Sequence, residues 1–229
     1  DLAALARDAD AEGFGLLWPG LATMVSGTEA SSIEAVVAAL QDPERLIRPA
    51  YQVSAYWNAH DWAWFTRAAA RLRAVVDAMR AGGFASFRRE LVGNTLSERA
   101  RVLGRALADY DVVQWQRKLT GRPFDSTIEI VLLHFSRPHG VKVQGQRFLQ
   151  SASYNVTTTL RIAAHEMLHP PVPMDGAAAT AAVQRLSEDA LVTRIVRDHD
   201  RRWGYNTLDG YLNEDLCQAL DQLIAEQLG

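Results

Sequence analysis

The segment from Asn155 to His169 constrains the fold of this 229-residue chain more than any other part of the sequence. Asn155 is a favourable helix N-cap, and the residues after it span about four helical turns. Pro170-Pro171 then ends the helix, because proline cannot continue the helical hydrogen-bond pattern. Apolar residues recur at helical spacing and predict one face buried against a core: Val156, Leu160, Ala163, Ala164 and Met167.

This predicted helix ends in the motif His165-Glu166-Met167-Leu168-His169, whose two histidines lie on the face opposite the apolar residues. The composition predicts only about 0.007 chance matches to H-E-x-x-H in a chain of this length. Residues four apart lie one turn apart on the same helix face, so both imidazoles can bind one metal ion. Glu166 lies one step round the helix, close enough to act on water at that metal. The alternative is a surface helix with two histidines of no special role.

The composition excludes several classes of protein. Hydrophobic residues make up 48% of the chain and charged residues 22%, which is typical of a globular protein. The net charge of −3 argues against a nucleic-acid-binding surface. No apolar run approaches the roughly 18 residues of a membrane span. Cys217 is the single cysteine, so an intrachain disulfide is impossible, and its sequence surroundings do not favour a role as nucleophile.

The chain begins with Asp1 rather than methionine, so we expect that an upstream segment has been cleaved or trimmed. A signal peptide for export to the periplasm or the medium is one such segment. The compartment is left open by the sequence, as is the oligomeric state.

The first half of the chain has the pattern of successive helices. Helices are predicted over 33–40, with a serine N-cap, and over 62–79, where Gly82-Gly83 ends the pattern. Thr95-Leu96-Ser97-Glu98 has the spacing of a capping box and opens a helix towards Tyr110. An aromatic cluster at about helical spacing is interpreted as core: Trp57, Trp62, Trp64 and Phe65.

The pattern changes after Pro123. Residues 127–135 are β-branched and apolar, which predicts a strand, and residues 141–154 predict one or two more. His134 and His139, near the strand end, are interpreted as structural. Helical patterning then resumes to the C-terminus, including one helix over 177–200. We therefore predict an α+β fold, with a helical part over residues 1–120 and a catalytic part over 121–229, or one continuous domain.

The segment from Leu160 to His169 resembles the active-site helix of the zincin metallopeptidases. The resemblance covers residues 160–169 closely, and the surrounding order of strands and helices matches that family only loosely. It implies that His165 and His169 bind zinc and that Glu166 activates the attacking water. Zinc lowers the pKa of its bound water to about 7, which provides a nucleophile at neutral pH.

The third zinc ligand is not fixed by the motif. A metzincin would have Gly and His where this chain has Val172 and Asp175, although some zincins use Asp at the latter place. Glu188 lies at the spacing used by one large group of gluzincins, the zincins with a Glu ligand, but its neighbours lack the rest of that pattern. Glu214 resembles the third ligand of other gluzincins, including bacterial families with a long gap after the His pair. Glu214 is preferred, followed by Glu188 and Asp175.

One pattern counts against Glu214. The leucines of the last helix predict a buried stripe that leaves Glu214 pointing away with Cys217 and Asp221. Glu214 could still be a ligand if the last helix had a second buried face, packed against the helix that carries the histidines. The predicted stripe comprises Leu212, Leu216, Ala219, Leu220 and Leu223.

A zinc hydrolase also needs a donor that stabilises negative charge on the substrate. Tyr211, Tyr205 and His199 are candidates because they precede Glu214. A strand edge between Val141 and Ser151 would suit an extended peptide. The expected function is zinc-dependent peptide hydrolysis, with Glu166 as general base and with peptide or protein as substrate. The alternative is a helical binding module, or a degenerate zincin, that binds metal and a partner without cleavage.

Overall fold

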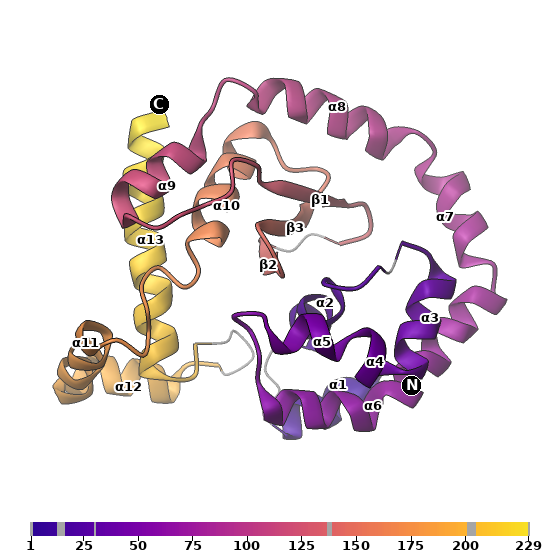
Figure 1. Ribbon diagram of the computed structural model, residues 1–229, viewed down its shortest axis with the longest axis horizontal. Helices are drawn as coiled ribbons and strands as arrows, with labels where there is room; N and C mark the ends of the chain where they lie inside the picture. Colours follow the sequence, from indigo (N-terminus) through magenta and orange to yellow (C-terminus); the bar gives the residue numbers. More distant parts are fainter. Residues whose placement is uncertain (1, 13–16, 30, 137–138, 201–204, 229) are drawn as a thin grey trace. The chain divides into compact units, whose positions relative to one another are not determined.

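The structure is a computed structural model that describes residues 2–12, 17–29, 31–136, 139–200 and 205–228. It is mostly helical with a small three-stranded sheet, which confirms the α+β class (Figure 1). The chain forms two compact units, residues 1–96 with 143–145 and residues 97–142 with 146–229. The expected boundary between residues 120 and 121 lies within the second unit. Of the helices in the described ranges, none is both long enough and apolar enough to cross a membrane.

The first unit is built from short helices around one long helix, α6. The predicted helices over 33–40 and 62–79 are both present, each slightly longer than expected. Ser32 caps α3 by accepting a hydrogen bond from the backbone N–H of Ala35 at 3.1 Å, and Gly82 ends α6. The helices are α1 (Leu2–Ala11), α2 (Leu17–Val25), α3 (Ile33–Gln41), α4 (Pro43–Leu46), α5 (Arg48–Gln52), α6 (Ala59–Ala81) and α7 (Phe84–Val92).

The aromatic cluster forms part of the core of this unit, as predicted. Trp62, Trp64 and Phe65 are buried, and Trp57 is partly buried against them. The indole N–H of Trp62 donates to the carboxylate of Glu44 at 3.0 Å, so its polar atom is satisfied within the unit. The aromatic residues are therefore structural rather than a ligand platform.

Residues 143–145 belong to the first unit through Gln144. The side-chain amide of Gln144 donates to the carbonyls of Thr23 and Met24, at 2.8 and 3.1 Å. Gly27 lies directly beside it, and a Cβ atom at Gly27 would come within 2.3 Å of the Gln144 Oε1 atom. A larger residue at position 27 would displace this glutamine.

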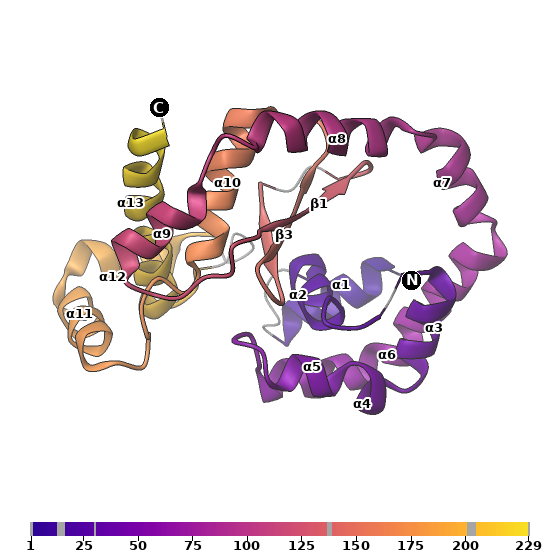
Figure 2. The same ribbon diagram turned by 45° about the horizontal axis from the view of Figure 1, so that its top comes forward.

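The second unit holds the sheet and the remaining helices (Figure 2). The helix α8 begins at Thr95, as the capping-box pattern indicated, and ends at Leu107, before Tyr110. The single helix predicted over 177–200 was wrong. Asp189 interrupts it, because its carboxylate caps a new helix by accepting from the N–H groups of Leu191 and Val192. The helices are α8 (Thr95–Leu107), α9 (Val112–Thr120), α10 (Val156–Leu168), α11 (Ala177–Glu188), α12 (Ala190–Asp198) and α13 (Leu208–Leu228).

The sheet has the strand order β1-β3-β2. The strand β1 (Glu129–Leu133) lies within the predicted strand over 127–135, and β2 (Val141–Val143) and β3 (Arg147–Ser151) lie within 141–154. β1 pairs with β3 in parallel, with Glu129 opposite Arg147. This order places β2 at one edge of the sheet, immediately after Gly140.

The helix α10 packs against β3 on one side and against α13 on the other. Ala163, Ala164 and Met167 are buried, as the apolar pattern predicted, whereas Val156 and Leu160 are half-buried. Ile162, three residues before His165, is also buried. The buried face of α10 is therefore wider than a single stripe.

Candidate metal centre

The helix α10 is held at both ends by side chains. At its start, the Asn155 side chain accepts a hydrogen bond from the N–H of Thr158 at 2.8 Å, as expected of an N-cap. At its end, the last carbonyl groups lack helical partners. The Arg122 guanidinium donates to the carbonyls of Leu168 and Pro170, and the Lys142 ammonium donates to the carbonyl of His169. These cations fix the turn that carries the second histidine of the motif.

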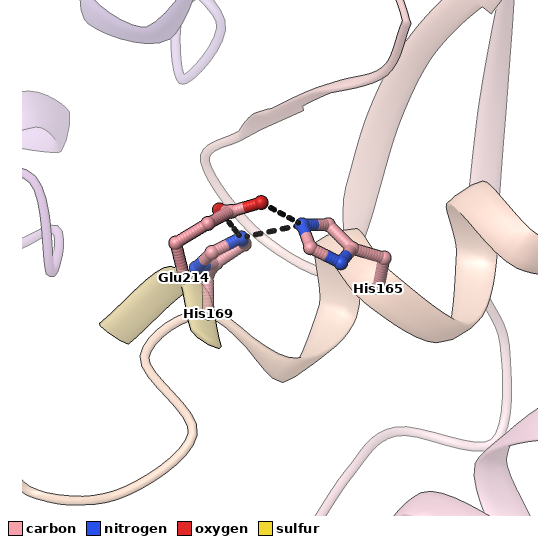
Figure 3. Close-up of side chains that lie close together, drawn as sticks. All are labelled: His165, His169 and Glu214. Atoms are coloured by element: carbon pink, nitrogen blue, oxygen red, sulfur yellow. Dashed lines mark hydrogen bonds and ion pairs between the residues drawn. The ribbon is translucent and has the colours of Figure 1, made fainter. Parts of the chain in front are cut away.

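Glu214, near the start of α13, lies beside both histidines of α10 (Figure 3). The Nε2 atoms of His165 and His169 are 3.1 Å apart. Each faces one oxygen of the Glu214 carboxylate, at 3.3 Å from His165 and 3.5 Å from His169. Among the described residues, these form the single group of at least three His, Cys, Asp or Glu side chains that could hold a metal ion.

The predicted leucine stripe of α13 was only partly right, because Leu212, Leu216 and Leu220 are half-buried whereas Ala219 and Leu223 are exposed. Leu223 is 45% exposed, whereas Cys217 and Ile224 are fully buried in the core cluster that includes α10. The helix is therefore rotated so that the line through Cys217 and Ile224 contacts α10. Because Glu214 is three residues before Cys217, this rotation turns its carboxylate towards the histidines rather than towards solvent.

The other ring nitrogen of each histidine is also engaged. His165 Nδ1 lies 2.8 Å from the carboxylate of Asp221, and His169 Nδ1 lies 3.3 Å from the side-chain oxygen of Asn213. The thiol sulfur of Cys217 also lies 3.3 Å from His169 Nδ1. These contacts orient the two rings, so that each Nε2 atom faces the Glu214 carboxylate and would be the nitrogen that binds a metal.

The protonation states of these side chains depend on one another. Burial lowers the pKa of His165, but the hydrogen bonds to Asp221 and Glu214 outweigh it and raise this pKa to about 10. Burial raises the pKa of Glu214, but the hydrogen bonds from His165 and Gln218 outweigh it and lower this pKa to about 2. Burial and the nearby positive charge of His165 lower the pKa of His169. Glu214 is therefore an anion at neutral pH, and His169 is a neutral imidazole.

The three side chains fit a zinc ion. Ligands about 2.0–2.1 Å from a tetrahedral zinc lie roughly 3.3 Å from one another, close to the separations between the nitrogen and oxygen atoms here. The side chains of His165, His169 and Glu214 are only 17%, 18% and 13% exposed. The Oε2 atom of Glu214 is buried and accepts no hydrogen bond. A buried anionic oxygen of this kind is costly unless a cation neutralises it.

Glu166 lies on the same face of α10, one residue after His165. Its carboxylate accepts a hydrogen bond from the backbone N–H of Lys142 at 2.8 Å, which joins it to the edge strand β2. Burial is the main reason that the pKa of Glu166 is raised. A Cβ atom at Gly140 would lie 2.7 Å from Glu166 Oε1, so only glycine leaves room for this carboxylate.

An open hollow of about 520 Å³ lies beside this group of side chains. Tyr205 lines it, close to the Glu214 carboxylate. Burial and the Glu214 carboxylate raise the pKa of Tyr205, so its hydroxyl remains protonated and can donate. Its backbone φ of 56° is unusual for a residue other than glycine and often accompanies a functional position. His139, interpreted from the sequence as structural, also lines this hollow.

The structure does not bring the other sequence candidates to this group. Glu188 and Asp175 are exposed, and neither belongs to the group formed by the histidines and Glu214. The Tyr211 side chain lies close to Asp215, and the ring of His199 forms a hydrogen bond with the carbonyl of Val196 on the preceding helix. Of the three proposed charge-stabilising donors, Tyr205 is thus the one that lines the hollow.

Some supporting residues were missed in the sequence. The interval between Glu214 and Asp221 is two helical turns, so it could have indicated that both face the histidines, but the leucine pattern pointed elsewhere. Gly140 and Lys142 could not be recognised from their neighbours in the sequence, because they contact Glu166 only in the folded chain. Gln116 also gave none, and its buried amide donates to the carbonyls of Ala163 and Ala164 at 3.1 and 3.0 Å.

The chain was compared with models of protein families, with curated proteins and with solved structures. None of these comparisons found a match. The function must therefore be inferred from the motif and from the geometry of the site.

Removal of the Asp221 charge tests the support of the first histidine. Asp221→Asn is expected to weaken zinc binding by about 10- to 100-fold, because the carboxylate orients His165 and increases its basicity as a ligand. Competition with a chelator of known affinity measures the change. Asp215→Asn, an exposed position on the same helix, is the matched control and should bind zinc like the parent chain. Equal affinity for both variants would show that Asp221 does not support the metal site.

Proposed function

We propose that this chain is a zinc-dependent peptidase of the gluzincin type, with a zincin-like arrangement of sheet and active-site helix. The observation that carries the proposal is the convergence of His165, His169 and Glu214, whose ligand atoms have the separations of a tetrahedral site. A catalytic zinc site uses three protein ligands and keeps a fourth position open. The hollow beside the group supports such an open position.

Each residue has a distinct role in the proposed reaction. His165, His169 and Glu214 hold the metal, and Asp221 and Asn213 orient the two imidazoles. When bound, zinc supplies a Lewis acid that makes water acidic enough to act as a nucleophile near neutral pH. Glu166 accepts a proton from this water and later delivers it to the leaving amine. Its raised pKa suits both steps, because the group must be able to hold the proton between them.

Tyr205 is the proposed donor to the substrate. Its protonated hydroxyl lies at the hollow, close to the Glu214 carboxylate. Peptide-bond hydrolysis places negative charge on the carbonyl oxygen, and a preorganised donor lowers the energy of that state.

A peptide is the proposed substrate for two reasons. The histidine helix resembles that of the zincin peptidases, and β2 lies at a sheet edge beside Glu166. An edge strand offers backbone hydrogen bonds to an extended chain and imposes little requirement on its side chains.

Metal analysis and cleavage of a peptide library together test this function. We expect close to one zinc per chain in protein purified without added metal or chelator, measured by elemental analysis. We expect the zinc-loaded protein to generate new termini in a mixed peptide library analysed by mass spectrometry, and the chelator-treated protein to generate none. Zinc without new termini would favour the metal-binding module that does not cleave. No zinc, and no uptake at micromolar concentrations, would refute the metal site itself.

A further inference from the structure

Arg161 is the residue on which this inference rests. It lies four residues before His165 on α10, one helical turn towards the N-terminus, and lines the same hollow. It also borders a smaller hollow of about 100 Å³ between α10 and the C-terminal end of α13. The residue is exposed, and within the described part of the chain it forms no hydrogen bond or ion pair. Its guanidinium is thus available to a ligand.

Arg161 differs in charge from the acidic side chains that line the same hollow. Glu166 already accepts a hydrogen bond from the Lys142 backbone N–H. Glu214 contacts the histidines and Gln218, and Asp221 contacts His165. Among the described residues that line the hollow, Arg161 is the single lysine or arginine. The guanidinium presents several N–H donors in a planar fork that matches a carboxylate. An anion that enters the hollow can therefore bind this permanent cation.

We propose that Arg161 binds a carboxylate of the peptide substrate close to the scissile bond. The proposal rests on the function proposed above and narrows its substrate class to peptides with an anionic group at that position. A helix rises about 1.5 Å per residue, so Arg161 and His165 are separated by about 6 Å along α10. The long arginine side chain leans further towards the N-terminus.

The same distances limit where the carboxylate can lie. An extended peptide advances about 3.3 Å per residue, so this offset corresponds to roughly two to four residues from the bond that is cut. Two groups supply a carboxylate there: the free C-terminus of a short peptide, and the side chain of an Asp or Glu residue.

Peptidyl hydroxamates test the subsite without requiring turnover. The hydroxamate anchors each compound on zinc. The three compounds differ in the dipeptide attached to it, which is Leu-Ala with a free carboxylate, Leu-Ala amide or Leu-Glu amide. Isothermal titration calorimetry measures their affinities for the zinc-loaded parent chain, for Arg161→Gln and for Arg185→Gln. Arg185 is an exposed arginine on α11 and serves as the matched control.

We expect at least one carboxylate compound to bind the parent chain and Arg185→Gln about 10-fold or more tightly than Leu-Ala amide does, as a charge-assisted hydrogen bond predicts. This preference should disappear in Arg161→Gln, while the affinity of Leu-Ala amide stays the same. The compound that carries the preference identifies the carboxylate as terminal or side-chain.

Two outcomes would overturn the proposal. Equal affinity of all compounds for the parent chain, or a preference that remains in Arg161→Gln, would exclude Arg161 as the anion site and leave the zinc site intact. Failure of every hydroxamate to bind would instead refute the zinc site, and the subsite would fall with it. The two failures are therefore distinguishable in one experiment.

Discussion

Replacement of Glu166 by glutamine is expected to lower the rate of peptide cleavage by about 10²- to 10⁴-fold, the usual contribution of a general base, and so to abolish detectable turnover. Glutamine keeps the size of the side chain but cannot accept a proton from water. Because Glu166 is not among the residues that would hold the metal, the zinc content should stay close to that of the parent chain. New termini in the peptide library and elemental analysis on the same preparation measure both quantities.

The matched control for this prediction is Glu188→Gln. Glu188 is exposed at the end of α11, so its replacement should change neither turnover nor zinc content. Full activity in Glu166→Gln would contradict the proposed mechanism. Loss of zinc from this variant would show that Glu166 takes part in metal binding, which the proposed division of roles does not allow.

Replacement of Glu214 by glutamine is expected to lower the zinc affinity by more than about 100-fold, beyond the loss usual for a supporting residue. The local hydrogen bonds hold the pKa of Glu214 at about 2, so the native residue offers a full negative charge to the metal at neutral pH. The amide oxygen of glutamine is neutral and is a much weaker ligand. Chelator competition measures the affinity, and peptide cleavage should fall in parallel unless zinc is added in excess.

Glu226→Gln provides the control on the same helix, because Glu226 is exposed near its C-terminal end. Circular dichroism should show the same helix content for both variants and the parent chain, since Glu214 lies near the start of α13 and glutamine keeps the size of its side chain. Unchanged zinc affinity in Glu214→Gln would remove Glu214 from the site. A third ligand would then have to come from elsewhere in the chain.

These two variants also separate the peptidase from the binding module. In a module that binds metal and a partner without cleavage, Glu166→Gln should leave function unchanged, whereas Glu214→Gln should still weaken the metal site. In the peptidase both variants lose activity, but only Glu214→Gln loses zinc. The pair therefore distinguishes the two functions through metal content as well as through activity.

Several local features were predictable from the sequence, because they depend on residues close together in the chain. The N-cap at Asn155, the course of α10 and the end of the helix before Pro170 follow from helix geometry and from proline. The placement of His165 and His169 on one face follows from their four-residue spacing. The β-branched run predicted β1, and the α+β class followed from the order of these patterns.

Which side chains contact these histidines could be determined only from the tertiary structure. Apolar residues lie on more than one face of α13, so the sequence pattern could not fix its rotation, and the burial of Cys217 and Ile224 against α10 did. That rotation brings Glu214 to the histidines and Asp221 to His165. Gly140 likewise meets Glu166 only because β2 packs beside α10. The spacing of residues on one helix involves only a few neighbours and can be predicted from the sequence. The element that packs against a helix face depends on the packing of the whole core.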